Sequence, residues 1–146
     1  MWNEIRNDSD IQKFMKLNYN FHDSCIKELK YTSGAYVKDN WMHPINSKRI
    51  LTVIIHGSFD RHSAIEMEFS GLEYINLNPV DEKYSCEIFG ATMLIKNCLI
   101  YWCDDDCVTI DNIDNYSGTV ICASKLRWRY ADEYMGEDEV FIPVSR

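Results

Sequence analysis

Residues 119–130, TVICASKLRWRY, decide the fold class of this chain. Because side chains of a strand alternate between two faces, the apolar residues in this stretch predict one long β-strand. The residues expected on its core face are Val120, Cys122, Leu126, Trp128 and Tyr130. The first half of the stretch is apolar on both faces, which predicts a position in the middle of a sheet.

The second half of this strand carries a row of cations on the face opposite the core. Lys125, Arg127 and Arg129 share that face in a protein of net charge -8. The row has two interpretations: it binds an anionic ligand, or it pairs across strands with Glu66 and Glu68. The pairing is the simpler one, because residues 64–70 alternate between apolar and acidic positions and predict a strand of their own.

Residues 1–20 are expected to form a helical segment that packs on the sheet. Ser9 is a candidate N-cap, and Gln12, three residues later, would complete a capping box. The helix is too short to be stable alone in water and needs a tertiary contact. Its predicted buried face consists of Ile11, Phe14 and Met15.

Short strand-like segments fill the rest of the chain, and residues 39–47 read as a loop. The other expected strands are 25–31, 35–38, 50–56, 64–70, 72–77, 84–89, 91–95, 98–102 and 108–110. No long helical pattern separates them, so a parallel sheet is not expected. The sequence predicts a single α+β domain over residues 1–146, mostly antiparallel β: a sandwich or a curved, barrel-like sheet with one short N-terminal helix.

Composition restricts the partners and the compartment. The chain has 23 carboxylates against 15 Lys and Arg residues, which argues against nucleic acid as its partner. No window is long and apolar enough for a membrane span, and the N-terminus lacks a signal-peptide core. We therefore expect a cytoplasmic protein with no membrane partner, whose six cysteines are reduced and unpaired.

The negative charge is concentrated in two segments, residues 104–115 and 132–139. The first contains Asp104, Asp105 and Asp106 in succession, with no basic residue among them. Such segments steer association with a basic protein partner, or they are simply solvated loops. Loop carboxylates without neighbouring cations are expected to contribute little to folding.

Candidate chemistry is sparse. His22 and Asp23, in the FHDS stretch, are a potential imidazole–carboxylate pair, although the same residues suit a turn between helix and strand. The segment from Cys103 to Cys107 suggests zinc, but no second ligand pair exists, and a calcium loop would need a central Gly and a terminal Glu. Nucleophile and phosphate-binding motifs are absent. We therefore predict no metal site, no cofactor and no catalytic residue.

Three short motifs, FHDS at 21–24, IEMEFSG at 65–71 and LRWRY at 126–130, resemble small bacterial β-rich proteins. Some members of this group are immunity proteins encoded beside polymorphic toxins. The resemblance implies a non-enzymatic binding protein and supplies no catalytic residues.

Two functions are consistent with these observations. The first is a non-catalytic inhibitor or immunity-like protein that masks a basic target with its acidic loops. The second is a small-molecule-binding protein or hydrolase whose pocket lies in the curved sheet, near the basic row or His22 and Asp23. The candidate binding residues are therefore Asp104, Asp105, Asp106, Lys125, Arg127, Arg129, His22 and Asp23.

Overall fold

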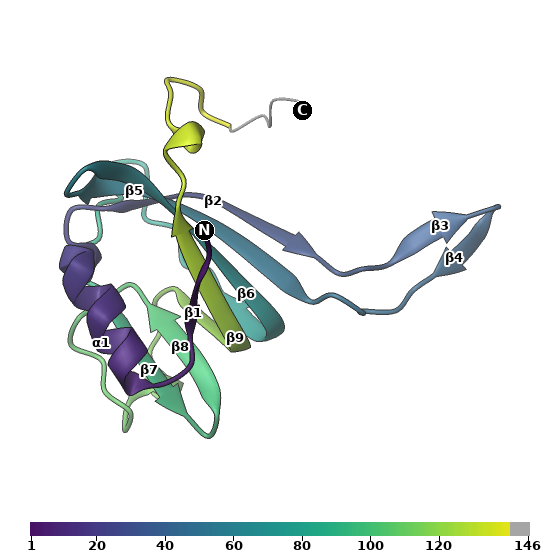
Figure 1. Cartoon of the computed structure of the whole chain (residues 1–146), viewed down its shortest axis with the longest axis horizontal. Coiled ribbons are helices and arrows are strands. Elements are labelled where there is room, and N and C mark those ends of the chain that lie inside the picture. Colours follow the sequence, from purple (N-terminus) through teal and green to yellow (C-terminus); the bar gives the residue numbers. More distant parts are fainter. Residues whose placement is uncertain (141–146) are drawn as a thin grey trace.

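The computed structural model describes residues 1–140 and contains one twisted antiparallel sheet with a helix against it (Figure 1). The main sheet has the strand order β2-β5-β6-β9-β8-β7, and β1 pairs with β9. Its strands are β1 (Asn3–Ile5), β2 (Cys25–Thr32), β5 (Ile50–Phe59), β6 (His62–Asn76), β7 (Thr92–Lys96), β8 (Leu99–Cys103) and β9 (Val120–Tyr130). The mostly antiparallel fold with one N-terminal helix is confirmed. Within residues 1–140 the sheet stays open, with β2 and β7 at its edges, and does not close into a barrel.

The strand β9 lies at the centre of the sheet, as the sequence predicted. One edge pairs with β6 along nearly its whole length. The other edge is shared: β8 pairs with residues 120–123, and β1 pairs with residues 126–128. The first four side chains of β9 are all buried, because both faces are covered there.

The prediction that all five apolar residues of β9 share one face is wrong. Leu126 and Trp128 belong to the main core, but Val120 and Cys122 belong to a second, smaller cluster on the opposite face. In the main core Leu126 is preceded by Ala123, a spacing of three residues instead of two. A bend between them turns the strand over, which a strict period of two does not anticipate.

The helix α1 (Asp8–Leu17) packs on the main core, where it contacts the C-terminal half of β9. Its predicted buried residues, Ile11, Phe14 and Met15, are confirmed. The ring centroids of Phe14 and Trp128 lie 4.4 Å apart. The predicted cap is wrong: Asn7 is the N-cap, and its side chain accepts a hydrogen bond of 2.9 Å from the Asp10 N–H. Asn is as good a cap as Ser, and the helix starts two residues earlier than the Ser9 motif implied.

A two-stranded hairpin, β3 (Tyr36–Lys38) and β4 (Trp41–His43), extends the β2–β5 pair away from the rest of the molecule (Figure 1). We call residues 33–49, which contain it, the arm. The expected loop at 39–47 is therefore wrong in part, because β4 occupies its centre. Asp39 and Asn40 both have positive φ, at 53° and 64°, the conformation required by a two-residue hairpin turn.

Two further expected strands do not form. Residues 84–89 make only one isolated bridge, Ser24 with Ile88, and residues 108–110 lie in a turn before the short 3₁₀ helix η2 (Ile113–Asn115). The expected strands 91–95 and 98–102 form the hairpin of β7 and β8, with its turn at Asn97 and Cys98, one residue later than the expected Lys96-Asn97. Residues 72–77, expected as another strand or as a bent continuation of 64–70, are the continuation, since β6 bends at Gly71 and runs on to Asn76.

The C-terminal segment begins with the 3₁₀ helix η3 (Asp132–Tyr134), which folds back on the sheet. His62 Nδ1 and Asp132 Oδ2 lie 2.8 Å apart, and the His62 ring stacks on Tyr130 with centroids 3.8 Å apart. Hydrogen bonds from the Ser63 N–H and from His62 hold the pKa of Asp132 below its usual value. The second acidic segment is thus partly anchored to the body. No helix within the described part of the chain is long and apolar enough to cross a membrane.

Candidate functional site

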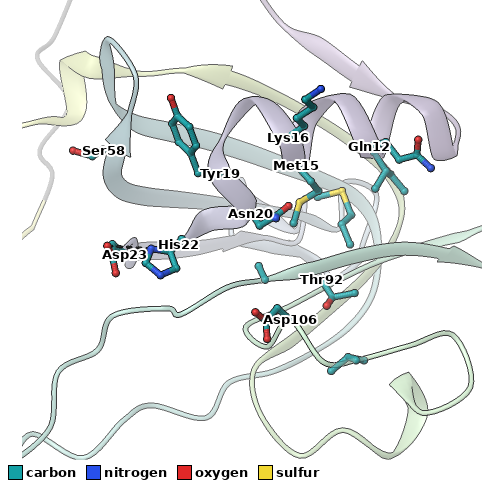
Figure 2. Close-up of a pocket in the computed structure, with 14 residues that line it drawn as sticks. Gln12, Met15, Lys16, Tyr19, Asn20, His22, Asp23, Ser58, Thr92 and Asp106 are labelled. Carbon is teal, nitrogen blue, oxygen red and sulfur yellow. Dashed lines mark ion pairs between the residues drawn. The ribbon is translucent and has the colours of Figure 1, made fainter.

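A large open groove lies between the C-terminal half of α1 and the start of β7, with a volume of about 1060 Å³ (Figure 2). Ile11, Met15 and Met93 supply apolar surface to its lining. His22, Asp23 and Asp106 also line it, so the structure brings together three of the predicted site residues from two distant segments. In Figure 2, Met15 lies on the helix side and Asp106 lies next to Thr92 on the opposite wall.

An unusual backbone turn builds one wall of the groove. The 3₁₀ segment η1 (Tyr19–Phe21) has φ values of 53°, 54° and 61°, and Asp23 has φ of 60°. Left-handed backbone costs about 1–2 kcal/mol per non-glycine residue. The turn is held because Phe21 is fully buried and because the Asp23 N–H donates to the Ile88 carbonyl at 2.8 Å. Costly backbone of this kind is concentrated at functional sites.

The turn presents His22 and Asp23 to solvent at one end of the groove. His22 Nδ1 and Asp23 Oδ2 lie 3.0 Å apart, and each side chain is 58% exposed. Such an exposed pair contributes little to stability, and its two residues remain available for contact. Among the hydrogen bonds of residues 1–140, none joins His22 to a serine or cysteine, as a base and its nucleophile would be joined.

The three consecutive aspartates have three different roles. Asp104 is structural: it accepts hydrogen bonds from the Tyr116 hydroxyl and, at 3.2 Å, from the Thr119 N–H. Burial and this bond raise the pKa of Tyr116. Asp105 accepts a bond of 2.7 Å from the Cys107 N–H and shapes the turn. All three aspartates were expected to contribute little to folding. This is wrong for Asp104, because its hydrogen bonds join it to residues that lie far along the loop.

Asp106 is the aspartate that faces the groove. It is exposed, and its carboxylate packs beside Gly90, where an added Cβ would lie 2.8 Å from Oδ2. Gly90 thus leaves room for the Asp106 side chain at the groove wall.

Asp105, Asp106 and Cys107 bring potential metal ligands within 4.8 Å of one another. All three come from one turn and two of them are exposed. Structural zinc takes four ligands, and Cys103 does not complete the set, because it is buried and its thiol donates to the Asp105 carbonyl at 3.6 Å. The arrangement is that of a hydrogen-bonded turn.

The basic row of β9 lies elsewhere and is largely neutralised, as the pairing interpretation predicted. Arg127 forms two hydrogen bonds with Glu68, at 3.0 and 3.1 Å, and Arg129 bonds Glu66 at 3.0 Å. The Trp2 ring covers the row, with the Arg127 guanidinium 4.2 Å from its centroid. The predicted anion site is thus not supported for these two arginines.

Lys125 differs from the two arginines because its cross-strand neighbour is Ser70, not an acid. It lines a smaller cavity of about 570 Å³ in the gap between β1 and β8. Two ion pairs, Arg6 with Glu4 and Arg127 with Glu68, line the same cavity. Lys125 therefore adds one net positive charge to the lining.

The sequence analysis missed the arm as a functional candidate. Five large apolar side chains are exposed within its 17 residues: Tyr36, Val37, Trp41, Met42 and Ile45 are 57–74% exposed. Such a concentration of exposed apolar side chains makes the arm a candidate interaction site. The available signal was the set of large apolar residues inside a segment rich in Gly, Asn and Pro, where nothing nearby in the sequence would bury them.

No family model, curated protein or solved structure matches this chain. The evidence for a function therefore comes from the geometry of the groove and the arm.

Proposed function

We propose that this is a non-catalytic protein-binding protein of the inhibitor or immunity type, and that its groove binds a basic segment of another protein. The observation that carries the proposal is the groove itself, whose lining combines apolar surface from Ile11 and Met15 with the carboxylates of Asp23 and Asp106. Lys16 is the one ammonium group in the described lining, so carboxylates outnumber it two to one. A basic, partly apolar peptide segment is complementary to this surface in both charge and polarity.

The surrounding charge supports the same partner chemistry. The loop that carries Asp106 contains five aspartates and no basic residue between positions 104 and 114. Only Asp114 has a salt bridge there, at 2.5 Å to Lys96 among the described residues. The net charge of -8 adds a long-range attraction for a cationic partner and speeds its association.

A second candidate, a small-molecule-binding protein or hydrolase, is favoured by the His22–Asp23 pair in the same groove. Against it stands the exposure of both residues, since general acid–base catalysis relies on groups whose proton affinities are tuned by burial and neighbours. The groove is also wide open, whereas small ligands are usually largely enclosed.

The compartment belongs to the same proposal. All six cysteines are unpaired in the structure, and three of them, Cys86, Cys98 and Cys107, are exposed. Exposed free thiols suit a reducing environment, which supports a cytoplasmic location.

Affinity capture from the source cell, with the Asp23→Asn/Asp106→Asn double variant as comparison, tests the proposal. At low ionic strength we expect wild type to retain a basic protein and the double variant to retain several-fold less of it. Asp111→Asn is the matched control, because Asp111 is exposed and in the same loop but does not line the groove. Equal retention by all three proteins would contradict the role of the groove. Loss of activity toward a small substrate in His22→Ala would favour the second candidate.

A further inference from the structure

The large apolar side chains of the arm are mostly exposed within the described chain. Both strands of the hairpin are exposed at every residue. A two-stranded hairpin alone in water is marginally stable and needs at least one further strand or a packed face. The two rings of Tyr36 and His43 stack at 4.4 Å, but this contact does not cover either face. A surface of this kind is completed by association.

We propose that the arm pairs with the arm of a second copy of this chain along β4, around a two-fold axis at Met42. The four strands would then form one small intermolecular sheet, in the order β3-β4-β4-β3. This inference does not depend on the proposed role of the groove, which lies on the opposite side of the body (Figure 1).

The backbone of β4 is arranged for this pairing. In a two-residue hairpin the pair next to the turn, Lys38 with Trp41, is the hydrogen-bonded one. The following pair, Val37 with Met42, is therefore not hydrogen-bonded, and the N–H and C=O of Met42 point away from β3. No described strand pairs with that edge. Two Met42 residues related by a two-fold axis would exchange both hydrogen bonds.

The side chains of β4 fit the same two-fold axis. Met42 would face Met42 of the second copy, and Trp41 would face His43, so no carboxylate or ammonium lies at the seam. The alternative seam along β3 would bring Lys38 beside Tyr36 and is less apolar. Along the outer edge of β4, the next residue after Met42 whose backbone would point outward is Pro44. Because proline has no N–H, the pairing is limited to one short strand.

The shape of the molecule also permits a second copy. The charged residues of the arm, Lys38, Asp39, Lys48 and Arg49, all lie outside β4, so none of them is at the seam. Because the arm projects from the body, two arms can meet while the two acidic bodies stay apart (Figure 1).

The test is the mass of the full chain in solution as a function of concentration, by analytical ultracentrifugation. We expect a reversible change from 17.2 kDa to twice that mass. Met42→Lys should raise the dissociation constant by about tenfold or more, because two cations would meet at the axis. Val37→Lys is the matched control: Val37 lies on the same face of the arm but outside the seam, so its effect should be small.

A cysteine variant tests the position of the axis. In a chain with Cys86, Cys98 and Cys107 replaced by Ser, Met42→Cys should form a disulfide-linked dimer on mild oxidation. The two Cα atoms of a hydrogen-bonded antiparallel pair lie about 5.5 Å apart, which is within disulfide range. Val37→Cys in the same background should remain single. A mass of one chain at every concentration, or cross-linking through Val37 in place of Met42, would overturn the proposal.

Discussion

Gly71 of β6 and Ser124 of β9 lie opposite each other. At this point each strand bends, and the face that points into the main core before the bend is not the face that points into it afterwards. A Cβ added to Gly71 would lie 3.2 Å from the Ser124 Cβ and closer still to its hydroxyl. Gly71 has φ of 61°, and the Ser124 hydroxyl donates to the Ser70 carbonyl at 3.3 Å. On either side of this point, Phe69 and Leu72 both contribute to the main core. One bend in two paired strands thus reverses their faces, and the register of the pair shifts by one residue just beyond it, between Leu72 and Tyr74.

Gly71→Ala should therefore destabilise the protein by about 2 kcal/mol or more, because alanine is strained at this φ and meets the Ser124 side chain. Urea unfolding measures the change. The same substitution in a Ser124→Gly background should cost less, since the steric part disappears while the backbone strain remains. Equal costs in the two backgrounds would mean that the two residues do not contact each other.

Trp128 is expected to be essential to the core, as the sequence already predicted. It is 6% exposed and packs on Phe14 and Tyr130. Trp128→Ala should lower the free energy of unfolding by about 3–5 kcal/mol. Trp41→Ala is the control of the same chemistry, because Trp41 is 74% exposed and its loss should change stability by less than about 0.5 kcal/mol. Both variants are compared by thermal unfolding at low chain concentration, and similar losses would contradict the assigned faces.

Arg129 should matter far more for stability than Lys125, although both belong to the same row. Glu66, the partner of Arg129, is only 6% exposed, so Arg129→Ala would leave a buried carboxylate without its cation. We expect a loss of about 3 kcal/mol, partly recovered when Glu66→Gln is added. Lys125→Ala, which removes no such pair, should be nearly neutral in the same denaturant titration. A loss for Lys125→Ala as large as that for Arg129→Ala would contradict the assignment of the buried ion pair to Arg129 and Glu66.

The six thiols should react in an order set by exposure and pKa. Cys86 and Cys98 are exposed and should be labelled first by a thiol reagent. The hydrogen bond to Asp106 raises the pKa of Cys107 and slows it. Burial and the neighbouring Cys86 raise the pKa of Cys25 to about 11, so few thiolates form there at neutral pH. Cys103 and Cys122 are buried and should require unfolding.

Mass spectrometry of the labelled intact protein gives this order. The unlabelled mass should be the same with and without reductant, and elemental analysis should find no stoichiometric zinc. A mass lower by two hydrogens for each bridge, or one zinc ion per chain, would contradict the assignment of free thiols.

The sequence predicted those features of the structure that depend on neighbouring residues, and it did not predict those that depend on residues far apart in the chain. Alternating patterns identified β6 and the ion pairs of Glu66 and Glu68, because strand periodicity and cross-strand pairing follow from neighbouring residues. The face reversal at Ser124 was missed, because it depends on Gly71, which is far away in the sequence. The structural role of Asp104 was missed for the same reason, since its partners Tyr116 and Thr119 are brought close only by the fold.

The candidate site was predicted in part. His22, Asp23 and Asp106 were selected individually, but no local pattern indicates that they share a groove. The left-handed turn that joins them is a tertiary feature, because intrinsic preferences disfavour it at Tyr19 and Phe21. In the arm the sequence predicts the strand at 35–38 but not β4, because three residues are too short for a periodic signal and the Asn and Pro residues around them indicate a loop.

The most direct test of the binding proposal is the association rate of the captured partner across ionic strength. Wild type and Asp23→Asn/Asp106→Asn are compared by surface plasmon resonance. Charges at the rim of an interface act mainly on encounter, so the double variant should associate several-fold more slowly at low salt while its dissociation rate stays nearly unchanged. The difference should fade above ~0.15 M salt, where the screening length is about 8 Å. A double variant that associates at the wild-type rate at low salt would contradict the proposal that the acidic groove binds a basic partner.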